Sequence, residues 1–210
     1  DIEVEVLSPH RDFSYPYSQS LNDNVNNDVK FTLIGVGALG SQFLNNMARK
    51  GYGKWNIIDN DIILPHNLTR HQSNRFGVGK PKVEFMSEYI NKAIYPSENI
   101  VKAYKLDFLK SSKEIKKPIL ESDYVIDIST SIPVERYLAN NFQEKRKFSA
   151  FLNPNGNDLD LLSEGATSAV SLDLIEFQYY KELINNEILS KHFDFQEHGR
   201  VRYARGCRDV

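Results

Sequence analysis

The sequence has few of the features that mark membrane, secreted or zinc-binding proteins. Its 210 residues include a single cysteine, which excludes an internal disulfide and a tetra-cysteine zinc site. No apolar run approaches the roughly 20 residues that a membrane span needs, and no secretory signal pattern is found. We therefore expect a cytoplasmic protein without a membrane partner.

The sequence also lacks an excess of charge of one sign. A formal net charge of −2 gives no reason to expect nucleic acid as a partner. Hydrophobic residues make up 40% and charged residues 26%, which are values typical of globular proteins. A chain of this length fits one hydrophobic core with appendages.

The ends of the chain differ in character from its middle. Residues 2–7 alternate apolar and charged side chains, which predicts a strand, and residues 8–29 are rich in Asn, Ser, Asp and Tyr, which predicts a linker. We expect residues 1–29 to be this N-terminal strand and linker, and residues 30–210 to form one domain. The first residue is Asp and the last ones form no polar tail, so we expect a segment of a longer polypeptide.

Short apolar runs alternate with helical patterns beyond the linker. Strands are expected at 29–35, 54–59, 99–104, 124–128 and 148–152, and helices at 40–50, 82–92, 133–143 and 171–190. A turn at 153–157 separates the last of these strands from another at 159–162, which predicts an antiparallel hairpin. The pattern predicts an α/β fold, a Rossmann-like doubly wound and mostly parallel sheet with an antiparallel hairpin extension.

A glycine-rich turn joins the first of these strands to its helix. It reads Gly35-Val36-Gly37-Ala38-Leu39-Gly40. Glycines here let the backbone approach phosphate oxygens, and the following helix N-terminus offers unpaired N–H groups. Asp59 ends the next strand about 20 residues later, where a carboxylate can bind ribose hydroxyls. The alternatives are a turn kept only for packing and an exposed acid, and neither feature separates NAD from ATP.

The residues after Asp59 carry a family resemblance. They read Asp59-Asn60-Asp61-Ile62-Ile63-Leu64-Pro65-His66-Asn67-Leu68-Thr69-Arg70, followed by Gly77-Val78-Gly79-Lys80-Pro81-Lys82. An acidic pair, then Asn-Leu and Arg, then Gly-Lys-Pro-Lys resembles the adenylation domain of the ThiF, MoeB and ubiquitin-activating superfamily. The resemblance covers about residues 30–170.

This resemblance implies ATP-dependent adenylation of the C-terminal carboxylate of a ubiquitin-like or sulfur-carrier protein, whose tail ends in a small residue. By similarity, the glycine turn and the acidic pair Asp59 and Asp61 bind the nucleotide. Asn67 and Arg70 contact phosphates, and Lys82 neutralises charge on the α-phosphate or the leaving group. Lys80 is the competing lysine. The family also implies a homodimer.

The resemblance further implies a magnesium ion. Asp127 ends the fourth expected strand and matches the family acid that positions Mg²⁺ on the phosphates. The two Cys-x-x-Cys pairs that often bind zinc in the bacterial members are missing, and Arg11 does not match the upstream arginine that reaches a partner's ATP. The histidines show no metal-ligand spacing and are expected to be solvated or locally bonded.

Cys207 lies between Arg205 and Arg208, which would favour its thiolate. It is either a nucleophile that forms a thioester with the activated carboxylate or an incidental buried thiol, and the sequence favours neither. Two other functions remain open, a nicotinamide-dependent oxidoreductase and a non-catalytic partner subunit of an activating enzyme.

Overall fold

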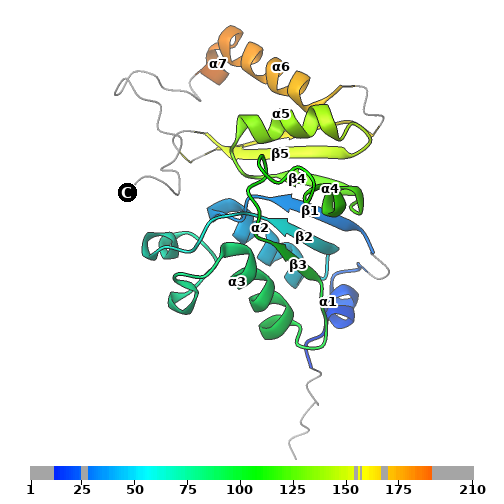
Figure 1. The fold of residues 1–210 in the computed structure, drawn as a ribbon. Coiled ribbons are helices and arrows are strands. Elements are labelled where there is room, and N and C mark those ends of the chain that lie inside the picture. The colour runs from blue at the N-terminus through cyan, green and yellow to red at the C-terminus, as the bar shows by residue number, and fades with distance from the viewer. Residues whose placement is uncertain (1–11, 25–27, 154–155, 157, 167–169, 191–210) are drawn as a thin grey trace, which may run out of the picture.

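A computed structural model describes residues 12–24, 28–153, 156, 158–166 and 170–190 (Figure 1). Its elements are α1 (Tyr15–Leu21), β1 (Lys30–Ile34), α2 (Ala38–Arg49), β2 (Lys54–Ile58), η1 (Pro65–Thr69), η2 (Arg75–Gly77), α3 (Lys82–Glu88), η3 (Tyr89–Ile94), β3 (Val101–Tyr104), α4 (Lys116–Leu120), β4 (Tyr124–Asp127), α5 (Ile132–Asn141), β5 (Arg146–Leu152), β6 (Leu159–Ser163), α6 (Leu172–Asn185) and α7 (Glu187–Ser190). None of the described helices is both long and apolar enough to cross a membrane.

The strands form one six-stranded sheet in the order β3-β2-β1-β4-β5-β6. Every neighbouring pair is parallel except β5 and β6, which run antiparallel. The strand order reverses between β1 and β4, so the carboxyl ends of these two strands border a crevice. The expected Rossmann-like doubly wound sheet with an antiparallel hairpin is confirmed.

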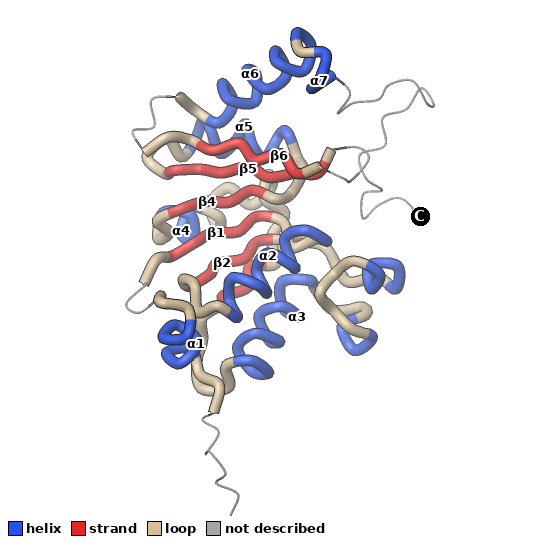
Figure 2. Tube along the Cα trace, turned by 180° about the vertical axis from the view of Figure 1, so that it is seen from behind, coloured by secondary structure: helices blue, strands red, loops and turns tan. Residues whose placement is uncertain are grey.

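Helices cover both faces of the sheet (Figure 2). On one face, α2 and α3 bury apolar side chains against β1, β2 and β3, as Leu44 and Met86 show. On the other face, α4 and α5 contribute Ile119 and Leu138 to a second apolar cluster. A third, smaller cluster of Ala139, Leu162 and Leu172 joins α5, β6 and α6. These layers hold the strand ends, and therefore the crevice, in a fixed position.

Part of the segment expected to be a linker forms the helix α1. Ser14 caps this helix by accepting a hydrogen bond from the Tyr17 N–H at 3.3 Å, and a proline occupies its first turn. The Tyr15 hydroxyl donates to the Gly53 carbonyl at 2.9 Å, which anchors α1 beside the end of α2. The expected strand at 2–7 lies outside the described residues.

Other differences concern short or irregular helices. The five-residue helix α4 has no counterpart among the expected elements, because so short a segment shows no helical period. The helix expected at 82–92 continues past α3 as the π-helical turn η3. The helix expected at 171–190 is divided between α6 and α7 at Asn186.

A buried carboxyl group joins α5 to β5. Glu135 is 6% exposed and accepts a hydrogen bond from the Ser149 hydroxyl at 2.7 Å. Burial raises the pKa of Glu135 to about 7, and the charges of Glu176 and Asp127 add to this effect. Glu135 therefore holds a proton in the folded protein at pH values where the unfolded chain has lost it.

This proton makes the stability of the fold depend on pH. The proton on Glu135 contributes its full stabilisation of the fold below pH 4.5, the ordinary pKa of this group. This stabilisation is lost as the pH rises through about 7, its pKa in the folded protein. We expect the unfolding free energy to fall by roughly 2–3 kcal/mol between pH 5 and pH 8 because of Glu135 alone. Urea unfolding of the wild type and Glu135→Gln measures this difference, and parallel pH curves for the two proteins would contradict it.

Candidate nucleotide-binding site

The site lies where β1, β2 and β4 end. Ile34 at the end of β1 pairs with Ile58 of β2 on one side and with Asp127 of β4 on the other. The chain continues from β1 into the glycine turn, whose Gly35 N–H donates to the Ile58 carbonyl at 2.9 Å. Segments far apart in sequence therefore meet at the sheet edge that borders the crevice.

The three glycines of the turn meet different surroundings. Gly35 has φ +87°, and a Cβ there would lie 2.7 Å from the Ser129 backbone. A Cβ on Gly40 would lie 2.1 Å from the Gly35 carbonyl oxygen. Apart from its chain neighbours, no described atom lies within 4 Å of a Cβ built on Gly37. Packing therefore requires Gly35 and Gly40, while Gly37 borders open space that a ligand can enter.

Helix α2 begins at this open space. Gly37 is its N-cap, and no described side chain bonds the N–H groups of its first turn. The first N–H groups of a helix, here those of Ala38 and Leu39, have no partner within the helix. Together with the helix dipole they form an anion-binding position. Their role as nucleotide ligands stays a prediction.

Alanine at two of these glycines should separate folding from binding. We expect Gly35→Ala to lower the unfolding free energy by more than about 2 kcal/mol, because the backbone strain and the Ser129 contact cannot both be relieved. Gly37→Ala should fold normally but weaken ATP binding about tenfold or more, because a methyl group would occupy the phosphate approach. Thermal unfolding and ATP titration of both variants test this contrast, and equal ATP affinity for Gly37→Ala and wild type would contradict it.

Asp59 is half-buried and fastens the glycine turn. Its Oδ2 accepts a hydrogen bond from the Val36 N–H at 2.8 Å, and its Oδ1 accepts one from the Asp61 N–H at 2.8 Å. Each carboxylate oxygen can accept a second hydrogen bond, so the group can bind the turn and a ribose hydroxyl together. The ribose contact itself stays a prediction.

Lys82 is a buried lysine at the start of α3. Its side chain is 2% exposed, and its Nζ lies 2.8 Å from Oδ2 of Asp61, whose side chain is 38% exposed. The ion pair fixes the ammonium group beside the Asp61 carboxylate. Lys80, by contrast, is half exposed and pairs with Glu88 at 3.4 Å on the surface.

Asn67 and Arg70 lie on the segment after β2 whose His71 contacts the glycine turn. Asn67 is 2% exposed, and its Oδ1 accepts a hydrogen bond from the Leu64 N–H at 2.9 Å. Its Nδ2 is buried with no partner among the described residues. Leaving such a donor unpaired costs about 1–3 kcal/mol, so a ligand oxygen would be a favourable partner. Arg70 also makes no side-chain hydrogen bond or ion pair within the described residues, while its carbonyl accepts from Gln42 of α2 at 3.4 Å.

Asp127 is buried at the end of β4. It is 2% exposed, and its Oδ1 accepts a hydrogen bond from the Ser129 N–H at 2.8 Å. Burial raises the pKa of Asp127 to about 6, and interactions with Ser129 oppose this only in part. A nearby cation would favour the ionised form of such a carboxyl group.

The described residues contain no group of three or more His, Cys, Asp and Glu side chains that could hold a metal ion. Mg²⁺ at a triphosphate, however, takes most of its ligands from phosphate and water and needs only one or two protein carboxylates. Asp127 fits that requirement. Its metal-binding role stays a prediction.

His71 was not identified from the sequence as part of the site. It is 5% exposed, and its Nε2 lies 2.8 Å from the carbonyl oxygen of Val36 inside the glycine turn. The expectation that the histidines are solvated or locally bonded is therefore only half right for this one, because its partner lies 35 residues away. No sequence period could reveal this contact.

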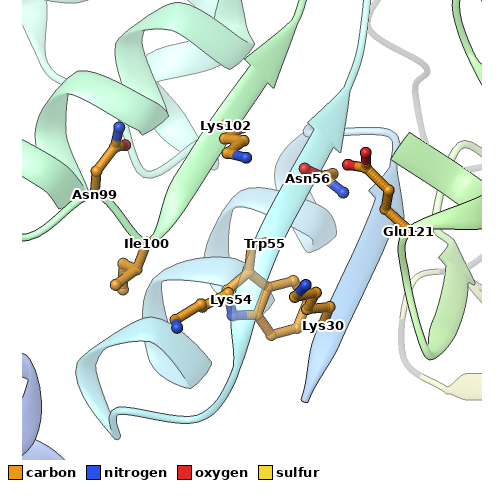
Figure 3. A pocket seen from close by; sticks show the side chains of 8 residues that line it. All are labelled: Lys30, Lys54, Trp55, Asn56, Asn99, Ile100, Lys102 and Glu121. Carbon is orange, nitrogen blue, oxygen red and sulfur yellow. The ribbon is translucent and has the colours of Figure 1, made fainter. Parts of the chain in front are cut away.

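Two cavities lie away from this crevice. One, of about 80 Å³, opens at the amino ends of β1, β2 and β3, where Figure 3 shows Lys30, Lys54 and Lys102 around it. The other, of about 190 Å³, lies beside the start of α6 and includes Lys147 and Glu164. Cys207 and Arg11 lie outside the described residues.

The chain matches a known protein family. A family model described as the ThiF family matches residues 19–156. The chain is 30% identical over 116 residues to the ATP-dependent ubiquitin transferase-like protein Cap2 of Enterobacter hormaechei, covering 54% of this chain and 19% of Cap2. It is 35% identical over 115 residues to the adenylyltransferase and sulfurtransferase UBA4 of Saccharomyces cerevisiae, covering 53% of this chain and 24% of UBA4. The chain thus spans a quarter or less of these relatives.

The fold has solved counterparts. The structure of E. coli tRNA N6-threonylcarbamoyladenosine dehydratase, TcdA, in complex with AMP superposes with a TM-score of 0.52 at 24% identity. The match covers 63% of this chain and 56% of TcdA. At this identity the likeness shows the fold.

Proposed function

This chain belongs to the ThiF family, and on that premise we propose that it uses ATP to adenylate the C-terminal carboxylate of a ubiquitin-like or sulfur-carrier protein. One observation carries the proposal. A continuous series of hydrogen bonds links the glycine turn at Val36 to Asp59, Asp59 to Asp61 and Asp61 to the Lys82 ammonium. A phosphate-binding turn and a buried cation are thereby joined at one sheet edge. The names of the relatives UBA4 and Cap2 support the same chemistry.

The proposed step is a substitution at the α-phosphorus of ATP. A carboxylate oxygen of the carrier tail forms a new bond to this phosphorus, and the bond to the β-phosphate oxygen breaks. The bonding electron pair leaves with pyrophosphate, and the product is an acyl-adenylate. Negative charge grows on the phosphate oxygens, so positive groups and N–H donors held in place beforehand lower the barrier.

Each site residue has a place in this step. Asp59 holds the ribose while it keeps the glycine turn in position. The N–H groups at the start of α2 and the unpaired Nδ2 of Asn67 bind phosphate oxygens. Arg70 and Lys82 neutralise charge on the α-phosphate and on the departing pyrophosphate, and Asp61 keeps the Lys82 ammonium directed toward them.

Asp127 would hold Mg²⁺ against the phosphates through its buried carboxylate. The ion, when bound, neutralises phosphate charge as a Lewis acid. The protein's own contribution is a carboxyl group whose backbone hydrogen bond from Ser129 fixes its direction at the strand end.

ATP–pyrophosphate exchange tests the function most simply. With small carrier proteins that end in glycine, labelled pyrophosphate should enter ATP only when the matching carrier is present. A nicotinamide-dependent oxidoreductase would give no exchange and would bind NAD in preference to ATP. A non-catalytic partner subunit would bind nucleotide but give no exchange with any carrier.

Cys207 gives the proposal a second stage. Its thiolate would attack the acyl carbon of the adenylate, form a thioester and release AMP. Intact-mass analysis with ATP and a carrier should then reveal an adduct that a thiol reagent removes. The adduct should be absent from Cys207→Ala, and an unchanged adduct in that variant would assign the acceptor elsewhere.

We also propose that a second copy of the chain packs on α6. Phe177 is 69% exposed on its outer face, with Leu174 and Ile184 exposed along the same stripe. In an antiparallel pair centred on Phe177, Asp173 of one copy meets Lys181 of the other, since each lies four residues from the centre. Sedimentation should give a dimer that Phe177→Asp dissociates, and a monomeric wild type would reject this pairing.

A further inference from the structure

The peptide groups on both sides of Val36 are held by side chains from the segment after β2. The Val36 N–H donates to Oδ2 of Asp59 at 2.8 Å. The Val36 carbonyl oxygen lies 2.8 Å from Nε2 of His71. The N–H and the carbonyl of Val36 are therefore both held by hydrogen bonds from outside the turn. The turn's own side chains supply no hydrogen bond.

The hydrogen bonds of His71 define its tautomer. Its Nδ1 accepts a hydrogen bond from the Ser73 N–H at 3.0 Å, so the ring proton must be on Nε2. Nε2–H then donates to the Val36 carbonyl. Only the neutral imidazole with this proton position satisfies both contacts in a site that is 5% exposed.

The direction of the Val36 carbonyl decides the direction of the next N–H group. In a planar trans peptide, the C=O of one residue and the N–H of the next point in opposite directions. His71 draws the Val36 carbonyl toward the buried side of the turn. The Gly37 N–H must then point away from His71. Apart from its chain neighbours, no described atom lies within 4 Å of a Cβ built on Gly37.

We propose that His71 is the positioning residue of the phosphate-binding turn, acting through the Val36 carbonyl to direct the Gly37 N–H at a nucleotide phosphate. The proposal rests on the proposed nucleotide-binding function of the same site. His71 touches no reacting atom, because the Val36 peptide lies between the imidazole and the ligand space. Its effect is to hold a donor in advance, so that phosphate binding need not reorder the turn.

The surroundings of His71 keep it neutral. Burial lowers the pKa of His71, and the Lys82 charge lowers it further, while the Val36 carbonyl and the Asp59 charge act in the opposite direction. A proton added at Nδ1 would face the Ser73 N–H, and one of the two donors would lose its acceptor. Acidic conditions that protonate His71 should therefore weaken the attachment of the segment around His71 to the glycine turn.

The decisive experiment combines two substitutions with a nucleotide-free measurement. His71→Ala removes the donor and should weaken ATP binding about tenfold. His71→Gln can place an amide N–H near the former Nε2 and should recover most of the affinity. His66→Ala, a histidine on the same segment, is the matched control and should change the affinity less than about twofold. ATP affinity is measured by titration at neutral pH.

The second measurement needs no nucleotide. In ¹⁵N NMR spectra of the apo protein, the His71 imidazole should show the neutral form protonated at Nε2, and His71→Ala should shift the Gly37 amide signal more than the signals of α3. Wild-type ATP affinity in His71→Ala, or a proton on Nδ1, would overturn the proposal. If the wild type binds no ATP, the nucleotide function fails, yet the imidazole and Gly37 signals still decide whether His71 orients the turn.

Discussion

Replacing Asp127 with asparagine is expected to lower the rate of ATP–pyrophosphate exchange by about 10²–10³-fold, because the carboxylate proposed to hold Mg²⁺ on the phosphates is lost. The same substitution should leave the fold intact or make it more stable. Asparagine keeps an oxygen that can accept the Ser129 N–H and removes a carboxylate that is costly to ionise where it lies.

The stability gain has a defined pH range. The folded pKa of Asp127 is about 6 and its ordinary value is 3.8, so the stabilisation from its proton is present below 3.8 and lost as the pH rises through about 6. Above about pH 6, the free energy of unfolding of Asp127→Asn should be roughly 1–3 kcal/mol higher than that of the wild type. Urea unfolding at pH 7.5 and exchange assays on the same preparation measure both effects.

Asp123→Asn is the matched control for this prediction. Asp123 precedes the amino end of the same strand and accepts the Lys30 N–H at 2.8 Å, at the opposite sheet edge. The control should retain exchange within about twofold. Full activity in Asp127→Asn, or a loss of activity that parallels a loss of stability, would contradict the assigned role.

Lys82→Met is expected to reduce exchange by about 10²-fold or more, since methionine keeps much of the buried stem but removes the ammonium group. The structure supplies the comparison in Lys80, two residues away. Lys80 pairs with Glu88 on the surface, where an ion pair is worth about 0–1 kcal/mol. Lys80→Met should therefore retain exchange within about twofold.

This pair of variants decides between the two lysines of the Gly-Lys-Pro-Lys sequence. Both substitutions remove one positive charge, so the net charge of the protein changes equally. Pre-steady-state formation of pyrophosphate separates a chemical defect from weaker ATP binding. Loss of exchange in Lys80→Met with activity retained in Lys82→Met would reverse the assignment.

The glycine turn and the sheet could be predicted because their signals are local. A strand, a turn with three glycines and an amphipathic helix follow one another without interruption, and Asp59 ends the next strand at a regular spacing. The antiparallel hairpin was also predictable, because an Asn-rich and Gly-containing turn separates two short apolar runs.

The remaining features depend on tertiary contacts. Nothing in the sequence around Lys82 indicates that its side chain is 2% exposed, because surface and buried lysines share the same helical pattern. The role of His71 likewise depends on a carbonyl that the fold brings beside it. Helix α1 was not predicted because seven residues are too few to show a helical period, and the hydrogen bond from Tyr15 that holds them joins a distant loop.

The most direct measurement is a titration of isotope-labelled protein with ATP and Mg²⁺, followed by NMR at the turn and at the two cationic side chains. The account predicts that the Gly37, Ala38 and Leu39 amides respond together with the Arg70 and Lys82 side-chain signals, with one dissociation constant. It is contradicted if the amides respond to a dinucleotide such as NAD in preference to ATP, or if Arg70 and Lys82 stay unchanged while the turn binds.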